Sequence, residues 1–148
     1  MRFAHTNIIA KDWRTLAQFY VDVFGCRVQP PERKQSGEWL TRGTGVPDAA
    51  LEGVHLLLPG HGERGPTLEV FSYAETLEHE PGPANRQGLA HLAFEVDDVE
   101  AVSTKVTQHG GSLEGSVTER LVEGVGTLTF VYARDPEGNI IEIQAWER

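Results

Sequence analysis

Apolar and polar positions in the first part of the chain follow first a strand and then a helix. Residues 3–10 form a mainly apolar segment, and apolar residues then recur every three or four positions across residues 12–24, which is the spacing of one helix face. Asp12 stands where a helix N-cap is expected, and Gly25 follows where a helix commonly ends. Three more strands are predicted downstream, over residues 26–30, 50–58 and 66–73.

The second part of the chain repeats this order of elements. An Ala-His pair ends at His5 in the first part and at His91 in the second, and Asp98 follows His91 at the spacing that separates Asp12 from His5. The segments GPTLEVFSY and GNIIEIQAW also correspond, because each follows a turn and carries a glutamate flanked by aliphatic residues. The second part is therefore predicted to contain a helix over 98–109. Its strands are predicted over residues 88–96, 112–118, 121–133 and 139–146. Such self-similarity indicates two copies of one βαβββ module.

The two modules are expected to form one domain, residues 1–148, because roughly 70 residues bury little apolar surface alone. Module 1 covers about residues 1–78, a Pro- and Gly-rich linker about 79–87, and module 2 about 88–148. The surplus length of module 1 falls in residues 30–49, whose Gly, Pro and charged residues indicate mostly loop or an edge strand. The segment ARDPEGNI near the end is typical of a tight hairpin connection. The predicted fold class is therefore α+β.

The composition narrows the partners of the protein. The chain of 148 residues has a formal net charge of −9, which disfavours nucleic acid and anionic membranes because phosphate groups are repelled. No apolar stretch approaches the ~20 residues of a membrane span, and the first residues lack the pattern of a signal peptide. Cys26 is the single cysteine; it is expected to be a small buried residue, and a lone thiol fits a reducing compartment. The expectation is a cytoplasmic protein that binds small molecules.

Four predicted strands each carry one metal-capable or titratable side chain at mid-strand, among apolar residues. These residues are His5, Glu69, His91 and Glu142. Because side chains alternate along a strand, all four lie opposite the apolar face that should carry a helix, on a face that mixes polar and large apolar residues as a cavity lining does. Taken singly, such a histidine is more commonly a hydrogen-bonded core residue, and such a glutamate more commonly lies on a solvated face. Their recurrence at matching positions of both modules instead favours one divalent metal, Zn, Ni, Co, Mn or Fe.

Other polar residues are weaker candidates for metal binding or substrate contact. His55 lies in a predicted strand and could face the same cavity, but it has no counterpart in module 2 and is expected to be structural. The remaining histidines are expected at the surface, in loops or near a helix end: His61, His79 and His109. Further candidates for substrate contacts, with a surface position equally open for the two arginines, are Arg42, Trp39 and Arg134.

The sequence resembles the vicinal oxygen chelate superfamily, which includes glyoxalase I, methylmalonyl-CoA epimerase, extradiol dioxygenases, and fosfomycin and bleomycin resistance proteins. The resemblance spans nearly the whole chain and depends on AHTNIIAKDWRTLAQFYVDVFGC, on GLAHLAFEVDDVEAV followed by a glycine pair, and on RDPEGNIIEIQ. It implies two βαβββ modules that form an eight-stranded, cup-shaped mixed sheet with the helices outside and a metal inside. The metal ligands that it implies are His5, Glu69, His91 and Glu142.

The resemblance also implies a type of chemistry. Two histidines and two glutamates are similar to the ligand set of glyoxalase-like and epimerase-like members, whereas the dioxygenases use two histidines and one glutamate. The implied reaction is proton abstraction next to a carbonyl of a small 2-oxo or 2-hydroxy substrate, with Glu142 or Glu69 as the base and an isomerase or lyase outcome. Residues expected to contact the substrate are Asn7, Phe71, Tyr73 and Trp146.

Two departures from the named enzymes leave the substrate open. Where bacterial glyoxalase I resembles HTMLRV, this chain reads HTNIIA with Ile9 at the arginine position, and near the last strand it reads ARDPEGN where the epimerase resembles HPK. Two alternative functions therefore stay in view, a non-catalytic binding or resistance protein of the bleomycin type and an Fe(II) extradiol-type dioxygenase. The resemblance also implies a homodimer, with the site either within one chain or between two.

Overall fold

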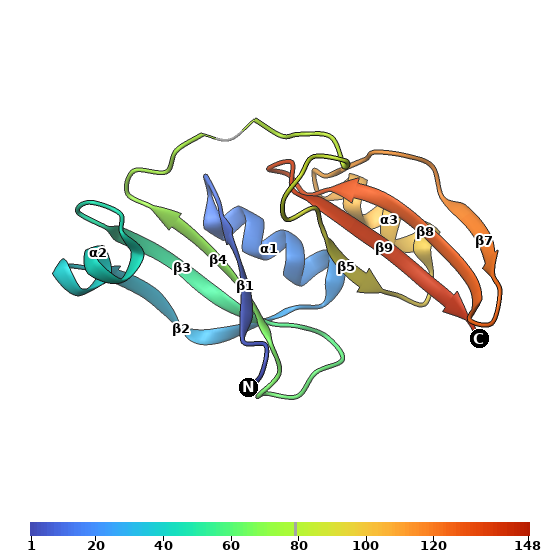
Figure 1. Ribbon diagram of the computed structural model, residues 1–148, viewed down its shortest axis with the longest axis horizontal. Coiled ribbons are helices and arrows are strands. Elements are labelled where there is room, and N and C mark those ends of the chain that lie inside the picture. The colour runs from blue at the N-terminus through green and yellow to red at the C-terminus, as the bar shows by residue number, and fades with distance from the viewer. Residues whose placement is uncertain (79) are drawn as a thin grey trace. The chain divides into compact units, whose positions relative to one another are not determined.

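A four-stranded sheet is the centre of the first of two units in this computed structural model, which describes residues 1–78 and 80–148 (Figure 1). The two units are Met1–His79 and Glu80–Arg148. In chain order, the elements of the first unit are β1 (His5–Ile9), α1 (Trp13–Phe24), β2 (Arg27–Ser36), α2 (Glu38–Thr44), β3 (Ala50–Leu57) and β4 (Thr67–Tyr73). The sheet order is β1-β4-β3-β2, with β1 parallel to β4 and the other pairs antiparallel.

The second unit repeats this arrangement. Its elements are β5 (Leu92–Glu95), α3 (Val99–Gln108), β6 (Ser112–Leu113), β7 (Thr118–Val122), β8 (Gly126–Arg134) and β9 (Ile140–Glu147). The sheet order is β5-β9-β8-β6, and β7 pairs with another stretch of β8. Strand β5 is parallel to β9, as β1 is to β4. Each unit thus contains a mixed sheet with a helix packed on it, and the predicted α+β class is confirmed. That the two modules together make one domain stays a prediction.

Alternation along the strands separates a helix-covered face from a second face in each unit. In β4, Leu68 and Val70 are fully buried, and α1, which packs on β3 and β4, contributes the fully buried Tyr20. In β9, Ile141 and Ile143 are fully buried, and α3 packs on β8 and β9 (Figure 1). The glutamate that stands between the two buried residues of each strand therefore faces the side of the sheet away from the helix.

The two longer helices begin at aspartate caps, which confirms the predicted helix starts. Oδ1 of Asp12 accepts hydrogen bonds from the backbone N–H groups of Arg14 and Thr15 at 3.1 and 3.2 Å, and its Oδ2 accepts one from the Thr15 hydroxyl at 2.6 Å. Asp98 caps α3 through its own side chain. Gly25 ends α1 with a φ of 69°, a left-handed conformation that suits glycine. Within the described parts of the chain, no helix is long and apolar enough to cross a membrane.

Replacing Asp12 by alanine is expected to lower the free energy of unfolding by about 1 kcal/mol at pH 7, because the cap is lost. Hydrogen bonds from Thr15, that of the side chain first, hold the pKa of Asp12 below its ordinary value. This stabilisation is therefore present above the pKa of the unfolded chain and is lost as the pH falls through the pKa of the folded state. Urea unfolding at pH 7 and in strong acid measures the difference. Asp12→Asn, which keeps an acceptor, should lose less at pH 7, and an equal loss for Asp12→Ala at both pH values would contradict the expectation.

The prediction for residues 30–49 is correct in part. The edge strand is confirmed, but β2 is longer than the predicted 26–30, since it continues through Pro30 and Pro31 to Ser36. Prolines are tolerated because, among the described strands, β2 pairs with β3 alone, so its outer edge needs no N–H donors.

The prediction of a loop over the rest of that segment is wrong, because α2 forms there. Its sequence EWLTRGT contains a glycine and lies between two others, so helix propensity is low. The helix is instead stabilised by tertiary packing, since Leu40 is buried in a cluster with Leu51 and Phe71. Sequence periodicity over seven residues is too short to reveal such a contact.

Strand boundaries in the second unit also differ from the prediction. The chain reverses near Gly124, whose φ of 77° is left-handed, so β7 ends at Val122 and β8 begins only at Gly126. The predicted strand over 88–96 is shorter, because pairing of β5 with β9 begins at Leu92. The prediction that His91 lies in mid-strand is therefore wrong, because this residue directly precedes β5.

Candidate metal-binding site

Glu69 lies at the centre of a row of polar side chains that crosses three strands of the first unit. The register places Asn7 of β1 on one side of it and His55 of β3 on the other. Asn7 Nδ2 donates a hydrogen bond to Glu69 Oε2 at 3.1 Å, and His55 Nε2 lies 3.2 Å from Glu69 Oε1. Glu69 is only 9% exposed, so these neighbours, rather than bulk water, stabilise its carboxylate.

His5 approaches the same carboxylate from the start of β1. Its Nδ1 lies 3.4 Å from Glu69 Oε1, and its side chain remains half exposed. The rings of His5 and His55 meet edge to face, with 6.4 Å between their centroids. The structure thus brings together two of the predicted ligands, His5 and Glu69, with Asn7 beside them.

The surroundings of His55 favour its uncharged form. Burial lowers the pKa of His55, and the charge of Arg33 and the proximity of His5 act in the same direction, while Glu69 opposes them. A lowered pKa keeps the uncharged form in excess at pH 7. Its second ring nitrogen, Nδ1, lies 3.4 Å from the hydroxyl of Thr67.

His91 and Glu142 form the corresponding pair in the second unit. His91 Nε2 lies 2.9 Å from Glu142 Oε2, and both side chains are largely buried but still reach solvent. The His91 ring also packs against the Tyr132 ring, with 4.9 Å between the centroids. In the register of the sheet, Glu142 lies between Ala93 of β5 and Tyr132 of β8.

The two glutamates occupy equivalent places but have unequal neighbours. Where an asparagine flanks Glu69, Ala93 flanks Glu142, and where a histidine flanks Glu69, Tyr132 flanks Glu142. Among the described residues of the second unit, Glu142 has a polar side-chain contact with His91 alone, and this contact involves one oxygen of the Glu142 carboxylate. Glu69 is held at both oxygens. Within its own unit, the carboxylate of Glu142 therefore has fewer polar contacts than that of Glu69.

Each histidine–glutamate pair fits part of the coordination sphere of a divalent metal. Nitrogen and oxygen ligands lie about 2.1 Å from such an ion, so two of them at right angles are roughly 3 Å apart. The pairs His5–Glu69 and His91–Glu142 are separated by 3.4 and 2.9 Å. Over the residues that the structure describes, no group of three or more His, Cys, Asp or Glu side chains is placed to hold a metal ion. Each pair thus supplies two of the ligands that a metal centre would need.

Two predicted substrate contacts lie beside the Glu69 row. Phe71 is 8% exposed and belongs to an apolar cluster with Leu40 and Leu51, against which Tyr73 packs. The Phe71 ring also meets the His55 ring, with 5.7 Å between centroids. These two aromatic residues thus form an apolar border on one side of the row.

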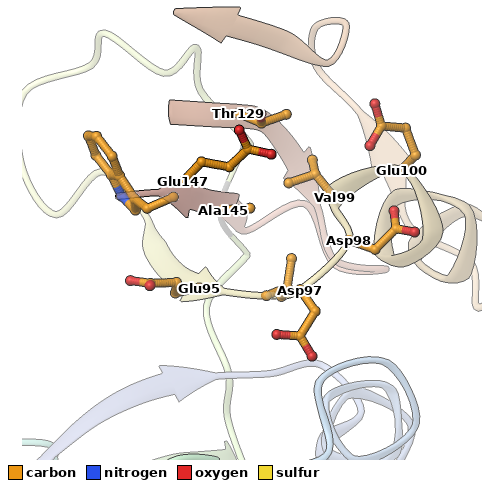
Figure 2. Close-up of a pocket in the computed structure, with 10 residues that line it drawn as sticks. Glu95, Asp97, Asp98, Val99, Glu100, Thr129, Ala145 and Glu147 are labelled. Atoms are coloured by element: carbon orange, nitrogen blue, oxygen red, sulfur yellow. The ribbon is translucent and has the colours of Figure 1, made fainter. Parts of the chain in front are cut away.

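Trp146, a further predicted substrate contact, lines a cavity of about 710 Å³ within the second unit. Carboxylates surround this cavity (Figure 2): Glu95, Asp97, Asp98, Glu100 and Glu147. Neither His91 nor Glu142 lines it. The negative charge of this cavity disfavours the binding of anionic molecules. The cavity is separate from the His91–Glu142 pair.

The other candidate substrate contacts have structural partners or lie at the surface. Arg134 donates hydrogen bonds to the carbonyl oxygens of Gly138 and Gly82 at 2.6 and 2.9 Å, and so connects the predicted linker segment to the turn before β9. Trp39 is 61% exposed, and its indole N–H donates to a neighbouring carbonyl. Arg42 is exposed in the last turn of α2.

The remaining histidines lie away from both pairs. His61 is exposed in the loop between β3 and β4. His109 is exposed at the end of α3, where its Nδ1 lies 2.8 Å from the Lys105 carbonyl oxygen. The surface positions predicted for these two are confirmed, and His79 lies outside the described residues.

The thiol of Cys26 is expected to be unreactive in the folded protein. Cys26 is 1% exposed, as the sequence predicted, and burial raises its pKa to about 12. The reactive thiolate is therefore nearly absent at pH 8. Ellman's reagent should label the thiol only after unfolding in guanidinium chloride, and rapid labelling in native buffer would contradict the buried position.

The sequence did not predict the contact of His55 with Glu69, because the residue has no counterpart in the second module. A usable signal was present in the strand order. Strands β3 and β4 are consecutive and antiparallel, and side chains that are direct partners share a face of the sheet. The register that pairs His55 with Glu69 follows from this hairpin and not from the repeat.

Comparison with known sequences assigns the family. The family model of the Glyoxalase/Bleomycin resistance protein/Dioxygenase superfamily matches residues 2–143. The chain therefore belongs to this superfamily, and the resemblance inferred from the sequence is confirmed. A relative in Escherichia coli (strain K12), the uncharacterized protein YaeR, is 29% identical over 139 residues, which cover 94% of this chain and 92% of YaeR.

Solved structures share the fold. A glyoxalase family protein from Bacillus cereus has a TM-score of 0.78 at 20% identity, covering 100% of this chain and 94% of that chain. The trypanothione-dependent glyoxalase I of Leishmania major has a TM-score of 0.63 at 21% identity, covering 98% of this chain and 86% of that chain. At such identities the similarity establishes the fold, and activity must be argued from the residues of this chain.

Proposed function

We propose that this protein is a metal-dependent isomerase or lyase of the glyoxalase type, which removes a proton next to the carbonyl of a small oxygenated substrate. The observation that carries the proposal is the contact between a histidine and a glutamate at equivalent places in both units, at 3.4 and 2.9 Å. Membership of the superfamily supports the same reaction class.

The proposed centre is one divalent metal, whose ligands would come from one chain or from two chains of a homodimer. The four ligands would be His5, Glu69, His91 and Glu142. Imidazole with carboxylate suits Zn, Ni, Co, Mn or Fe. When bound, the cation supplies Lewis acidity, which stabilises the negative charge that develops on the substrate oxygens.

Glu142 is the better candidate for the base. A carboxylate that takes a proton must turn toward the substrate carbon, and Glu69 is restrained at both oxygens by Asn7 and His55. Glu142 is held at one oxygen by His91. In an isomerisation of a 2-hydroxy carbonyl compound, Glu142 would take the proton from the hydroxyl-bearing carbon and return it to the former carbonyl carbon. The hydroxyl hydrogen would pass to the former carbonyl oxygen, so that atoms balance and no further reactant is needed.

The substrate would be a 2-oxo or 2-hydroxy compound that lies across the polar row. Asn7 would donate a hydrogen bond to it, and the apolar border of Phe71 and Tyr73 would contact its carbon chain. Trp146 shares a face of β9 with Glu142, because the two residues are four positions apart on one strand. It is proposed as a further contact at the end of that face.

Elemental analysis of protein purified without chelators or a polyhistidine tag is the first test of the proposal. We expect Zn, Ni, Co or Mn, with the metal lost in both Glu69→Ala and His91→Ala. Unchanged metal content in the two variants would show that the ligand assignment is wrong. Arg42→Ala, an exposed change on α2, is the matched control and should keep the metal.

Proton exchange separates the proposed reaction from the alternatives. Nuclear magnetic resonance in deuterated buffer, over a panel of 2-oxo and thioester compounds, should reveal exchange at the carbon next to a carbonyl. Tight ligand binding without metal or exchange would instead indicate a non-catalytic binding protein. Fe(II) together with oxygen consumption would indicate a dioxygenase.

A further inference from the structure

His55 contacts the carboxylate of Glu69 from a strand that supplies none of the four proposed ligands. It lies on β3 directly opposite Glu69 in the antiparallel register. Its Nε2 is 3.2 Å from Glu69 Oε1, whereas Asn7 occupies Oε2 from the other side. Three adjacent strands therefore form one continuous row through this glutamate.

The partners of the two ring nitrogens determine which one carries hydrogen. A carboxylate only accepts hydrogen bonds, so the nitrogen that faces Glu69, Nε2, must be the donor. The other nitrogen, Nδ1, lies 3.4 Å from the Thr67 hydroxyl, which can donate to it. A neutral imidazole with its hydrogen on Nε2 satisfies both contacts.

Packing restrains the ring of His55 in this orientation. The Phe71 ring meets it edge to face, at 5.7 Å between centroids and 67° between planes. Phe71 is itself fixed over Gly53, since a Cβ on Gly53 would lie 2.2 Å from Phe71 Cδ1. A restrained donor holds its acceptor at a lower entropic cost than a mobile donor does.

We propose that His55 is a positioning residue, whose Nε2–H fixes the carboxylate of Glu69 in the orientation needed for metal binding. The inference rests on the proposed function, because it takes Glu69 to be a ligand. It would account for different roles of the two glutamates: Glu69 would be the fixed ligand, and Glu142, which has Tyr132 in the place equivalent to His55, would be the carboxylate that accepts the proton. Hydrogen-bond partners of this kind typically change metal affinity roughly 10- to 100-fold when they are lost.

Two variants of His55 separate positioning from packing. His55→Gln keeps an N–H donor near the place of Nε2, whereas His55→Leu keeps a similar volume without a donor. We expect His55→Leu to weaken Co²⁺ binding roughly 10- to 100-fold and to alter the visible spectrum of the bound Co²⁺. His55→Gln should restore most of the affinity and the spectrum. Equal weakening in both variants, or none in His55→Leu, would overturn the inference.

A measurement on the metal-free protein distinguishes failure of the positioning role from failure of the proposed function. Long-range ¹H–¹⁵N nuclear magnetic resonance spectra report which nitrogen of His55 carries hydrogen. We expect the Nε2–H form in the wild-type protein and a loss of that preference in Glu69→Ala. If wild-type protein binds no Co²⁺ but has this form, the metal-dependent function fails while the positioning of Glu69 stands. An Nδ1–H form in the wild-type protein would overturn the positioning role directly.

Discussion

Replacing Glu142 by glutamine is expected to slow proton exchange at the substrate carbon roughly 100- to 10,000-fold, the usual contribution of a general base. The amide of glutamine does not accept a proton at neutral pH, although its oxygen can still face a metal. The contact of Glu142 with His91 at a single oxygen is the structural reason for assigning it this role. Exchange rates in deuterated buffer, normalised to the metal content of each preparation, measure the effect.

Glu69→Gln is the matched control for this prediction. Because Asn7 and His55 restrain Glu69, its loss should lower metal affinity more than turnover per bound metal ion. The reverse result, with full exchange in Glu142→Gln and none in metal-loaded Glu69→Gln, would assign the base to Glu69 instead.

Asp135→Ala is expected to lower the free energy of unfolding by roughly 2–4 kcal/mol, more than Asp12→Ala does. The reason is that three hydrogen-bond donors around a buried carboxylate lose their acceptor at once. Asp135 is 3% exposed. It accepts hydrogen bonds from the backbone N–H groups of Glu137 and Asn139 at 2.9 and 3.0 Å and from the Asn139 side chain at 2.8 Å. Denaturant unfolding followed by circular dichroism measures the change.

The conservative variant Asp135→Asn tests whether these hydrogen bonds are responsible. Its side-chain oxygen can still accept from the two backbone groups, so we expect a smaller loss than for alanine. A loss as large as that of alanine would point to charge rather than to the backbone contacts. Since this turn sets the register of β8 with β9, Asp135→Ala should also weaken the contact between His91 and Glu142.

The features that sequence predicts well are those with a local physical cause. Asp12 caps α1 because its side chain reaches the free N–H groups of the first turn, and the same argument holds for Asp98. The face of Glu69 follows from strand alternation, because its two neighbours are aliphatic. The sequence repeat gave a second, independent reason to treat Glu69 and Glu142 as residues at equivalent positions of the two modules.

The features that sequence missed depend on contacts between distant segments. Helix α2 is stabilised because Leu40 packs in an apolar cluster with residues of β3 and β4. The sequence of α2 itself contains no pattern that predicts this contact. The contact of His55 with Glu69 arises only when β3 pairs with β4 in one register. Comparison of the two modules could not predict this contact, because Tyr132 occupies the equivalent place in the second module.

The outer edge of β2 limits how copies of this protein can associate. An unpaired strand edge is a template for sheet extension and aggregation, which prolines, charges and irregularities discourage. Pro30 and Pro31 offer no N–H groups along this edge, a register shift falls between Gln29 and Arg33, and charged side chains occupy much of the rest. These features of β2 disfavour the addition of a strand from another copy of the chain along this edge.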